Sequence, residues 1–96
     1  MGYQLSKKAE LDLINIWEYI FHKWSKKQAD RYIKLLIDEI KFLSKNHKTG
    51  KDQQEIREGY RCTQMKSHLI FYKQKDKTSI EVIRVLHQRM DTDSHL

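Results

Sequence analysis

The pattern of apolar and polar positions changes once along the chain, from a helical period to an alternating one. Between residues 9 and 43, apolar side chains recur every three or four positions, as on one face of an amphipathic helix. From about Gln54 onward they alternate or run together, as in strands that are half or fully buried. Before the helical part, residues 1–5 place Tyr3 and Leu5 on one face with a period of two. The pattern predicts a strand, then helices, then further strands.

Two helices are predicted in the first half of the chain. Ser6 offers an N-cap to the first, and residues 25–28 have the S-x-x-Q form of a capping box at the start of the second, which residues 46–50 end. The link between them is short, so we expect an antiparallel hairpin. The apolar stripes comprise Ala9, Leu13, Ile16, Trp17, Ile20, Phe21 and Trp24 in the first helix, and Ala29, Tyr32, Ile33, Leu36, Ile37, Ile40 and Leu43 in the second. We expect both tryptophans to pack in the core.

Three strands are predicted in the second half, at residues 60–66, 68–74 and 79–86, with the polar stretch 75–78 joining the last two as a hairpin. We expect the sheet to be antiparallel. In the last strand, simple alternation puts Arg84 on the same face as Ile80, Val82 and Leu86. An arginine in that position needs a partner or an open groove.

The order of elements predicts an α+β fold, in which the N-terminal strand is followed by a helical hairpin packed on a small twisted antiparallel sheet. With 96 residues, the chain is long enough for a single domain, residues 1–96, at the lower end of what buries its own core. Its apolar content of 39%, with two Trp, five Tyr and three Phe, supports a globular domain although 33% of its residues are charged.

Charge and cysteine content restrict the setting. Nineteen Lys and Arg against thirteen Asp and Glu give a net charge of +6, which favours an acidic partner, although such a charge is also explained by solubility alone. Cys62 is the single cysteine, so an intramolecular disulfide is excluded and a reducing compartment is the simpler interpretation. The N-terminus does not have the form of a signal peptide, and no apolar stretch approaches the roughly 20 residues that span a bilayer. We expect a cytoplasmic protein without a membrane partner, metal site or cofactor.

Several segments together carry a resemblance to a known family. They are the spaced set Ser6, Ala9, Asp12, Leu13, Ile16 and Tyr19, then Trp24, Gln28, Ala29 and Tyr32, then Ile56, Arg57, Gly59, Tyr60 and Arg61, then HLIFY from His68, and finally RVLHQRMD from Arg84 to Asp91. In this combination and order the chain resembles the ParE toxins of the RelE/ParE superfamily along its whole length.

The resemblance implies the toxin of a bacterial toxin-antitoxin pair. Characterised ParE proteins target DNA gyrase and stabilise its cleaved-DNA state, so the protein is expected to inhibit another enzyme by binding rather than to be an enzyme itself. Antitoxins of the family are usually dimeric DNA-binding proteins whose disordered, acidic and amphipathic tails fold on the toxin. The expected partners are therefore a ParD-like antitoxin and DNA gyrase, with promoter DNA reached only through the antitoxin.

The related RelE branch cleaves messenger RNA on the ribosome, which leaves a nuclease as an alternative. RNA cleavage through the 2′-hydroxyl needs a base, an acid and cations for the phosphorane charge. This chain could supply them through Arg61 and Arg84 on a phosphate, His87 as acid, and Glu55 or Glu58 as base. Gln88 stands where several such nucleases have an aromatic residue for stacking on a base, which counts against this alternative. A third possibility is a diverged chain that only binds antitoxin.

The C-terminal run is the predicted target-binding end. Its candidate residues are Arg84, His87, Arg89, Met90 and Asp91. We predict that they project from the last strand into a tail that core packing does not require. The alternative is that Met90 and Leu96 fold back onto the sheet while Asp91 pairs with Arg89. His87 has three open roles, namely a structural hydrogen bond, target contact and catalysis, whereas His68 is expected to be a hydrogen-bonded residue at a strand edge.

The predicted antitoxin surface combines apolar residues outside the main stripes with cations. The apolar residues are Leu11, Ile14, Leu35 and Phe42, and the cations are Arg31, Lys34, Arg57 and Arg61. A tail that folds on binding needs both, because ordering it costs several kcal/mol that buried area must offset. The alternative is that these apolar side chains are scattered on the surface, as is normal in soluble proteins.

Overall fold

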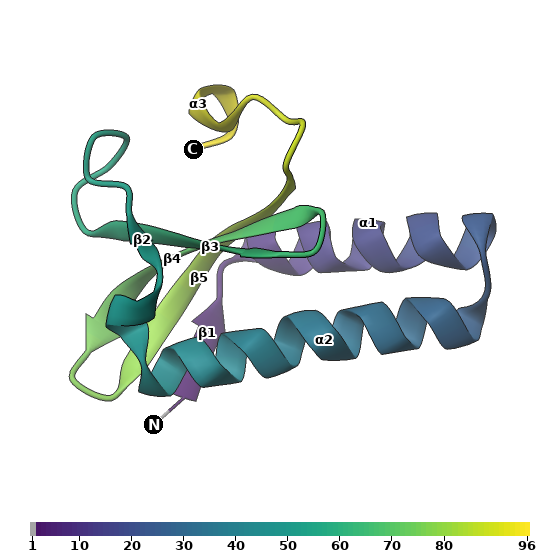
Figure 1. The fold of residues 1–96 in the computed structure, drawn as a ribbon, viewed down its shortest axis with the longest axis horizontal. Coiled ribbons are helices and arrows are strands. Elements are labelled where there is room, and N and C mark those ends of the chain that lie inside the picture. The colour runs from purple at the N-terminus through teal and green to yellow at the C-terminus, as the bar shows by residue number, and fades with distance from the viewer. Residues whose placement is uncertain (1) are drawn as a thin grey trace.

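A helical hairpin covers one face of a five-stranded sheet in the computed structural model (Figure 1), which describes residues 2–96 except for the side chain of residue 93. Met1, part of the predicted first strand, lies outside the described residues. The elements are β1 (Gly2–Leu5), α1 (Lys7–Lys23), α2 (Lys26–Lys45), a 3₁₀ turn η1 (His47–Thr49), β2 (Lys51–Asp52), β3 (Tyr60–Met65), β4 (His68–Asp76), β5 (Ser79–His87) and α3 (Thr92–His95). The predicted α+β fold is confirmed.

Both helices begin at the predicted serine caps. Ser6 Oγ accepts a hydrogen bond from the backbone N–H of Ala9 at 3.0 Å, and Ser25 Oγ accepts one from Gln28 at 3.1 Å. Each serine therefore satisfies an amide that has no partner within its helix. At the other end of α2, the backbone N–H of Asn46 donates to the carbonyl of Phe42 at 3.0 Å.

The sheet has the strand order β1-β5-β4-β3-β2, and its pairings are mixed. The pairs β2–β3, β3–β4 and β4–β5 are antiparallel, as expected, whereas β1 runs parallel to β5. The purely antiparallel prediction is thus wrong for the N-terminal strand. The whole helical hairpin and the antiparallel strands intervene between β1 and β5, and a parallel pair requires such a long connection. The elements η1, β2 and α3 were not predicted, because each is too short to show a period.

An irregularity in β5 changes which side chains share a face. Phe71 of β4 pairs with Arg84, but the next residue, Tyr72, pairs with Val82, so Ile83 is an extra residue in β5. This is a β-bulge, and it shifts the alternation by one position. The prediction that Arg84 shares a face with Ile80 and Val82 is therefore wrong.

Two apolar clusters lie on the two faces of the sheet. The larger one, between sheet and helices, contains Ala9, Leu13, Leu36, Ile40, Leu43, Ile70, Tyr72, Ile80, Val82 and Val85. The smaller one, on the opposite face, consists of Cys62, Phe71 and Leu86, with Leu69 and the C-terminal Leu96 packed against it. The bulge in β5 explains why Val85 belongs to the first cluster and its neighbour Leu86 to the second.

The far end of the hairpin reaches past the sheet (Figure 1). Trp24, predicted to pack in the core, is 69% exposed, and Trp17 is half-buried with its ring stacked on Phe21 at 5.1 Å. The core prediction is wrong for Trp24, because the apolar stripe continues beyond the layer that could cover it. Within residues 2–96, neither helix of the hairpin nor α3 is both long and apolar enough to cross a membrane.

Candidate functional site

A groove of about 850 Å³ lies between the overhanging hairpin and the end of the sheet. The 20 residues of α2 and the 9 residues of β5 each span ~30 Å, but the strands cross beneath the hairpin at an angle, so its far end has no strand below it (Figure 1). Its apolar lining includes Ile16, Tyr19, Ile20, Trp24, Tyr32, Leu35, Val85 and Met90. Tyr19 is 61% exposed and Met90 45% exposed. These side chains form an open surface for a partner with apolar groups.

Two histidines lie at the sheet side of the groove. His68 and His87 are paired across β4 and β5, with ring centroids 5.3 Å apart in an edge-to-face arrangement. Nδ1 of His68 shares a 2.6 Å hydrogen bond with the hydroxyl of Tyr32, so the prediction of a hydrogen-bonded His68 is confirmed. Burial, and then the neighbouring His87, lower the pKa of His68 to about 4. His68 is thus neutral near pH 7 and adds no charge to the groove.

The exposed charges in the groove lining are cationic. Arg31 of α2 and Lys66, in the turn between β3 and β4, line the groove and are exposed. Asp12 also lines it, but its carboxylate is bonded to Arg84 and its side chain is only 12% exposed. The groove therefore combines apolar walls with uncompensated positive charge.

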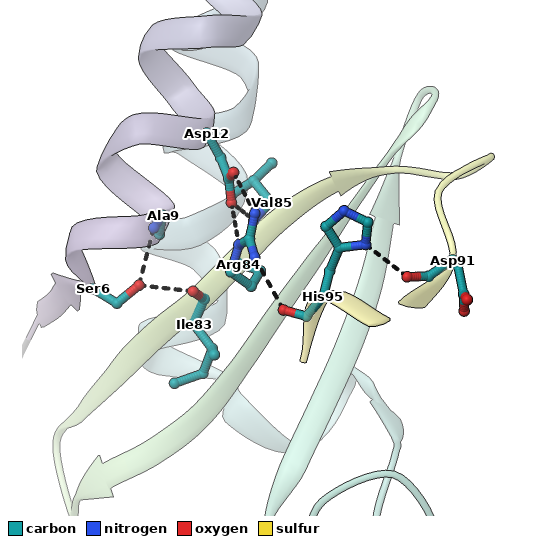
Figure 2. A network of polar contacts seen from close by, with 8 residues as sticks. All are labelled: Ser6, Ala9, Asp12, Ile83, Arg84, Val85, Asp91 and His95. Atoms are coloured by element: carbon teal, nitrogen blue, oxygen red, sulfur yellow. Dashed lines mark hydrogen bonds and ion pairs between the residues drawn. The ribbon is translucent and has the colours of Figure 1, made fainter. Parts of the chain in front are cut away.

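Asp12 is the centre of a polar network that joins α1 to β5 (Figure 2). Its two carboxylate oxygens accept hydrogen bonds from Nε and Nη2 of Arg84, both at 2.8 Å, and Oδ2 also accepts from the backbone N–H of Val85 at 2.9 Å. This fork is the strong geometry for an arginine and a carboxylate, and the hydrogen bonds to Asp12 raise the pKa of Arg84 further above its usual high value. Nearby, Ser6 Oγ donates to the carbonyl of Ile83 at 2.7 Å.

The network follows from the end of β1. Strand β1 pairs with β5 only as far as Leu5 and Val82, and the N–H of Ser6 then donates to the Val82 carbonyl. Beyond that point, β5 has no neighbouring strand on this side, and side chains of α1 and its cap take up the backbone groups of Ile83 and Val85. Arg84, predicted to project toward a target, is instead only 14% exposed in its ion pair. Its predicted need for a partner is met by Asp12.

The C-terminal segment turns back over the second face of the sheet. Nη1 of Arg84 donates to the carbonyl of His95 at 3.0 Å, and Nη2 of Arg57 donates to the carbonyl of Leu96 at 3.1 Å. Leu96 folds back as the alternative prediction described, whereas Met90 stays exposed at the edge of the groove. The carboxylate of Asp91 accepts from the Ser94 hydroxyl at 2.7 Å.

The exposed part of this segment is the run from Gln88 to Asp91, together with Ser94. The run follows directly after His87, whose Nδ1 accepts a hydrogen bond from the backbone N–H of Arg89 at 3.1 Å. The structure thus gives His87 a structural bond and also a place in the groove lining. Of the five residues predicted to bind the target, all except Arg84 lie at or near the surface between the groove and α3.

The five residues of the nuclease alternative do not gather at one place. Arg84 is held by Asp12, while Nη1 of Arg61 donates to the carbonyl of Gly50 at 2.8 Å. Glu55 and Glu58 are exposed in the loop before β3, and His87 alone of the set lines the groove. Among the described residues, no group of three or more His, Cys, Asp or Glu side chains is placed to hold a metal ion. The arrangement offers no common phosphate-sized site for this set.

The residues predicted to bind the antitoxin also separate. Arg31 and Leu35 line the groove, whereas Leu11, Ile14 and Phe42 are exposed outside it, at 57%, 52% and 48%. Lys34 pairs with Asp38 at 2.8 Å on the helix surface, a contact of small energetic value. Arg57 is bonded to the C-terminus and Arg61 to Gly50. Two members of the predicted set therefore belong to the groove, and the side chains of Lys34, Arg57 and Arg61 are engaged in contacts within the protein.

Most of the groove lining was not predicted from the sequence. Tyr19, Trp24, Tyr32 and Met90 carry its apolar surface, and the first three lie in or beside the stripes that were predicted as core. No local signal distinguishes them, because an apolar stripe has the same period where the sheet covers it and where the helices extend beyond the sheet.

Comparison with known proteins agrees with the fold and adds the family. Residues 3–92 match the family described as the ParE toxin of type II toxin-antitoxin systems, parDE. A protein named Toxin ParE1 from Mycobacterium tuberculosis is 39% identical over 94 residues, covering 98% of this chain and 96% of that protein. Toxin ParE1 of Caulobacter vibrioides is 36% identical over 94 residues. Toxin ParE of Escherichia coli is 31% identical over 95 residues, covering 99% of this chain and 92% of that protein.

A solved structure has the same fold. It is described as the chromosomal ParDE TA system from P. aeruginosa, and it superimposes with a TM-score of 0.76 over 91% of this chain and 95% of that chain, at 16% identity. The likeness in structure supports the fold, and the full-length relatives supply the family. The chain therefore belongs to the ParE toxin family of type II toxin-antitoxin systems.

Proposed function

We propose that this toxin inhibits DNA gyrase by binding it and stabilising its cleaved-DNA complex, and that a ParD-like antitoxin neutralises it. The observation that supports this most is membership of the ParE family along the whole chain, at 39% identity to Toxin ParE1 of Mycobacterium tuberculosis. The dispersal of Arg61, Arg84, His87, Glu55 and Glu58 counts against the nuclease alternative, since general acid–base catalysis requires its groups within hydrogen-bond reach of one substrate.

The proposed target surface is the segment from His87 to Asp91, which is exposed from Gln88 onward. Arg89 supplies an exposed cation and Met90 an exposed, flexible apolar side chain, a combination suited to a large protein–DNA assembly. The segment begins at the end of β5 and ends where α3 is held against the sheet, so a partner meets it in a restricted conformation. Such preorganisation lowers the entropic cost of binding.

The proposed antitoxin site is the groove. A disordered antitoxin tail needs enough apolar contact to offset its ordering, and the aromatic side chains of Tyr19, Trp24 and Tyr32 supply it. Arg31 and Lys66 favour an acidic tail through charge complementarity. An antitoxin of this kind would also carry the complex to promoter DNA, so that the toxin itself needs no DNA contact.

A pair of purified assays tests the proposal against its alternative. The toxin is titrated into a supercoiling reaction with gyrase, and separately into a ribosome programmed with message, each with and without antitoxin. We expect supercoiling to be inhibited and relieved by antitoxin, while the message stays intact. Uninhibited supercoiling at high toxin concentration together with cleaved message would establish the nuclease function instead.

A further inference from the structure

Asp12 makes more contacts with β5 than a surface ion pair requires. Three hydrogen-bond donors of β5 converge on its carboxylate, namely Nε and Nη2 of Arg84 and the backbone N–H of Val85. Both side chains are largely buried, at 12% and 14% exposure, so the ion pair is only weakly screened by solvent. Asp12 thereby fixes both the bulge in β5 and the direction of the Arg84 guanidinium.

The remaining nitrogen of Arg84 connects this network to the C-terminal segment. Nη1 donates to the carbonyl of His95 at 3.0 Å, as Figure 2 shows, and this carbonyl belongs to the last residue of α3. With only four residues, α3 is far below the length at which a helix is stable by itself. Its position therefore depends on tertiary contacts, which are the bond from Arg84, the bond from Arg57 to Leu96, and the packing of Leu96.

We propose that Asp12 is a positioning residue for the target-binding segment. It orients Arg84, Arg84 holds the carbonyl of His95, and residues 87–91 are thus anchored at both ends, by β5 and by the docked α3. This inference rests on the proposed function of the segment. Asp12, in the N-terminal helix, would thus support the activity of the C-terminal end. It lies 72 residues before Arg84 in the sequence.

The direct test is the substitution Asp12→Asn, which keeps the size of the side chain and removes its charge. Ser6→Ala is the matched control, because Ser6 also joins the start of α1 to β5, through Ile83, but has no bond to Arg84 in the network. Arg84→Lys is a second test variant. It keeps the positive charge and lacks the planar fork needed to hold Asp12 and the His95 carbonyl together.

The first readout is amide hydrogen exchange at Leu96, whose N–H donates to the carbonyl of Thr92 within the C-terminal segment. The second is growth arrest per amount of soluble toxin, which does not depend on the identity of the target. The exchange rate at Leu96 in each variant is corrected for the change in exchange at the amides of α2, because those amides report global stability. We expect exchange at Leu96 to be roughly tenfold or more faster in Asp12→Asn than in Ser6→Ala, because losing a hydrogen bond to a charged group changes an equilibrium by about that factor. Growth arrest should weaken in parallel.

Two results would overturn the inference. One is exchange at Leu96 that is no faster in Asp12→Asn and Arg84→Lys than in Ser6→Ala. The other is faster exchange with undiminished growth arrest, which would mean that anchoring the segment does not matter for toxicity. Failure of the proposed target is a separate result, since the unchanged protein would then arrest growth without inhibiting gyrase.

Discussion

Among single residues, Trp24 departs furthest from what its position in the apolar stripe predicts. It stands at the end of α1, where the stripe continues but the sheet below it has ended, and 69% of its surface is exposed. A large aromatic side chain in this position contributes little to folding and much to a partner that covers it.

We therefore predict that Trp24→Ala weakens antitoxin binding by roughly 30-fold or more, the size of an interface hot spot. The free energy of unfolding should change by less than about 0.5 kcal/mol, as for most exposed positions. Phe21→Ala is the control, because Phe21 is an aromatic residue of the same helix, 40% exposed, that does not line the groove. Titration calorimetry with the antitoxin tail measures both affinities, and equal losses would argue against the groove.

His68 makes the stability of the fold dependent on pH. Its pKa of about 4 in the folded state lies below its ordinary value of 6.5, so the unfolded chain takes up a proton first as the pH falls. Its contribution to stability is complete above pH 6.5 and is lost progressively toward pH 4. Because His68 is only half-buried, we expect a loss of about 1 kcal/mol between pH 7.5 and pH 5.

Urea denaturation at these two pH values tests the effect. His68→Gln should remove this part of the pH dependence, whereas the exposed His22→Gln should keep it. Carboxylates titrate in all of these proteins, so the difference between the two variants isolates His68. Parallel pH dependence in both variants would mean that the neutral His68 is not the cause.

At the scale of elements, α1, α2 and the three longer antiparallel strands follow from the sequence, because each carries a clear period and recognisable ends. The serine caps at Ser6 and Ser25 are visible in the same way. The bulge at Ile83 does not follow, since one extra residue leaves the apolar composition of β5 unchanged while reversing the face of Arg84. The parallel pairing of β1 depends on a partner 77 residues away, given that Gly2 pairs with Ser79.

The candidate site is predicted less well than the fold for the same reason. The C-terminal run is a local feature, and its exposed residues Arg89, Met90 and Asp91 were predicted from sequence as the target-binding end. The groove is created by the angle at which the strands cross beneath the hairpin, which no local pattern records. Leu11 and Ile14 resemble groove residues in the sequence, yet they lie outside it.

The C-terminal segment and the groove are therefore expected to act separately. Arg89→Glu reverses an exposed charge that does not line the groove, and Lys51→Glu makes the same change in net charge at the exposed first residue of β2. We predict that Arg89→Glu reduces growth arrest roughly tenfold relative to Lys51→Glu, as expected for loss of a close charge pair at an interface. Antitoxin affinity should be the same for both variants within about threefold. Equal growth arrest in the two variants would show that toxicity depends on net charge and not on this segment.

For the whole molecule, the fold places the two proposed binding surfaces side by side on one small domain. The hairpin overhang holds the aromatic groove, while the end of β5 and the docked α3 present the exposed segment beside it. Met90 belongs to both, since it lines the groove and lies in the segment. An antitoxin that fills the groove would therefore reach the edge of the proposed target surface, which gives neutralisation a direct steric cause.

The most direct test is the amount of linear DNA that purified gyrase leaves when plasmid is incubated with increasing toxin and the reaction is stopped by detergent. The account predicts that linear DNA accumulates with the unchanged toxin, that antitoxin abolishes it, and that Arg89→Glu needs roughly tenfold more protein for the same yield. No linear DNA above that of gyrase alone, at toxin concentrations that saturate the antitoxin, would contradict it.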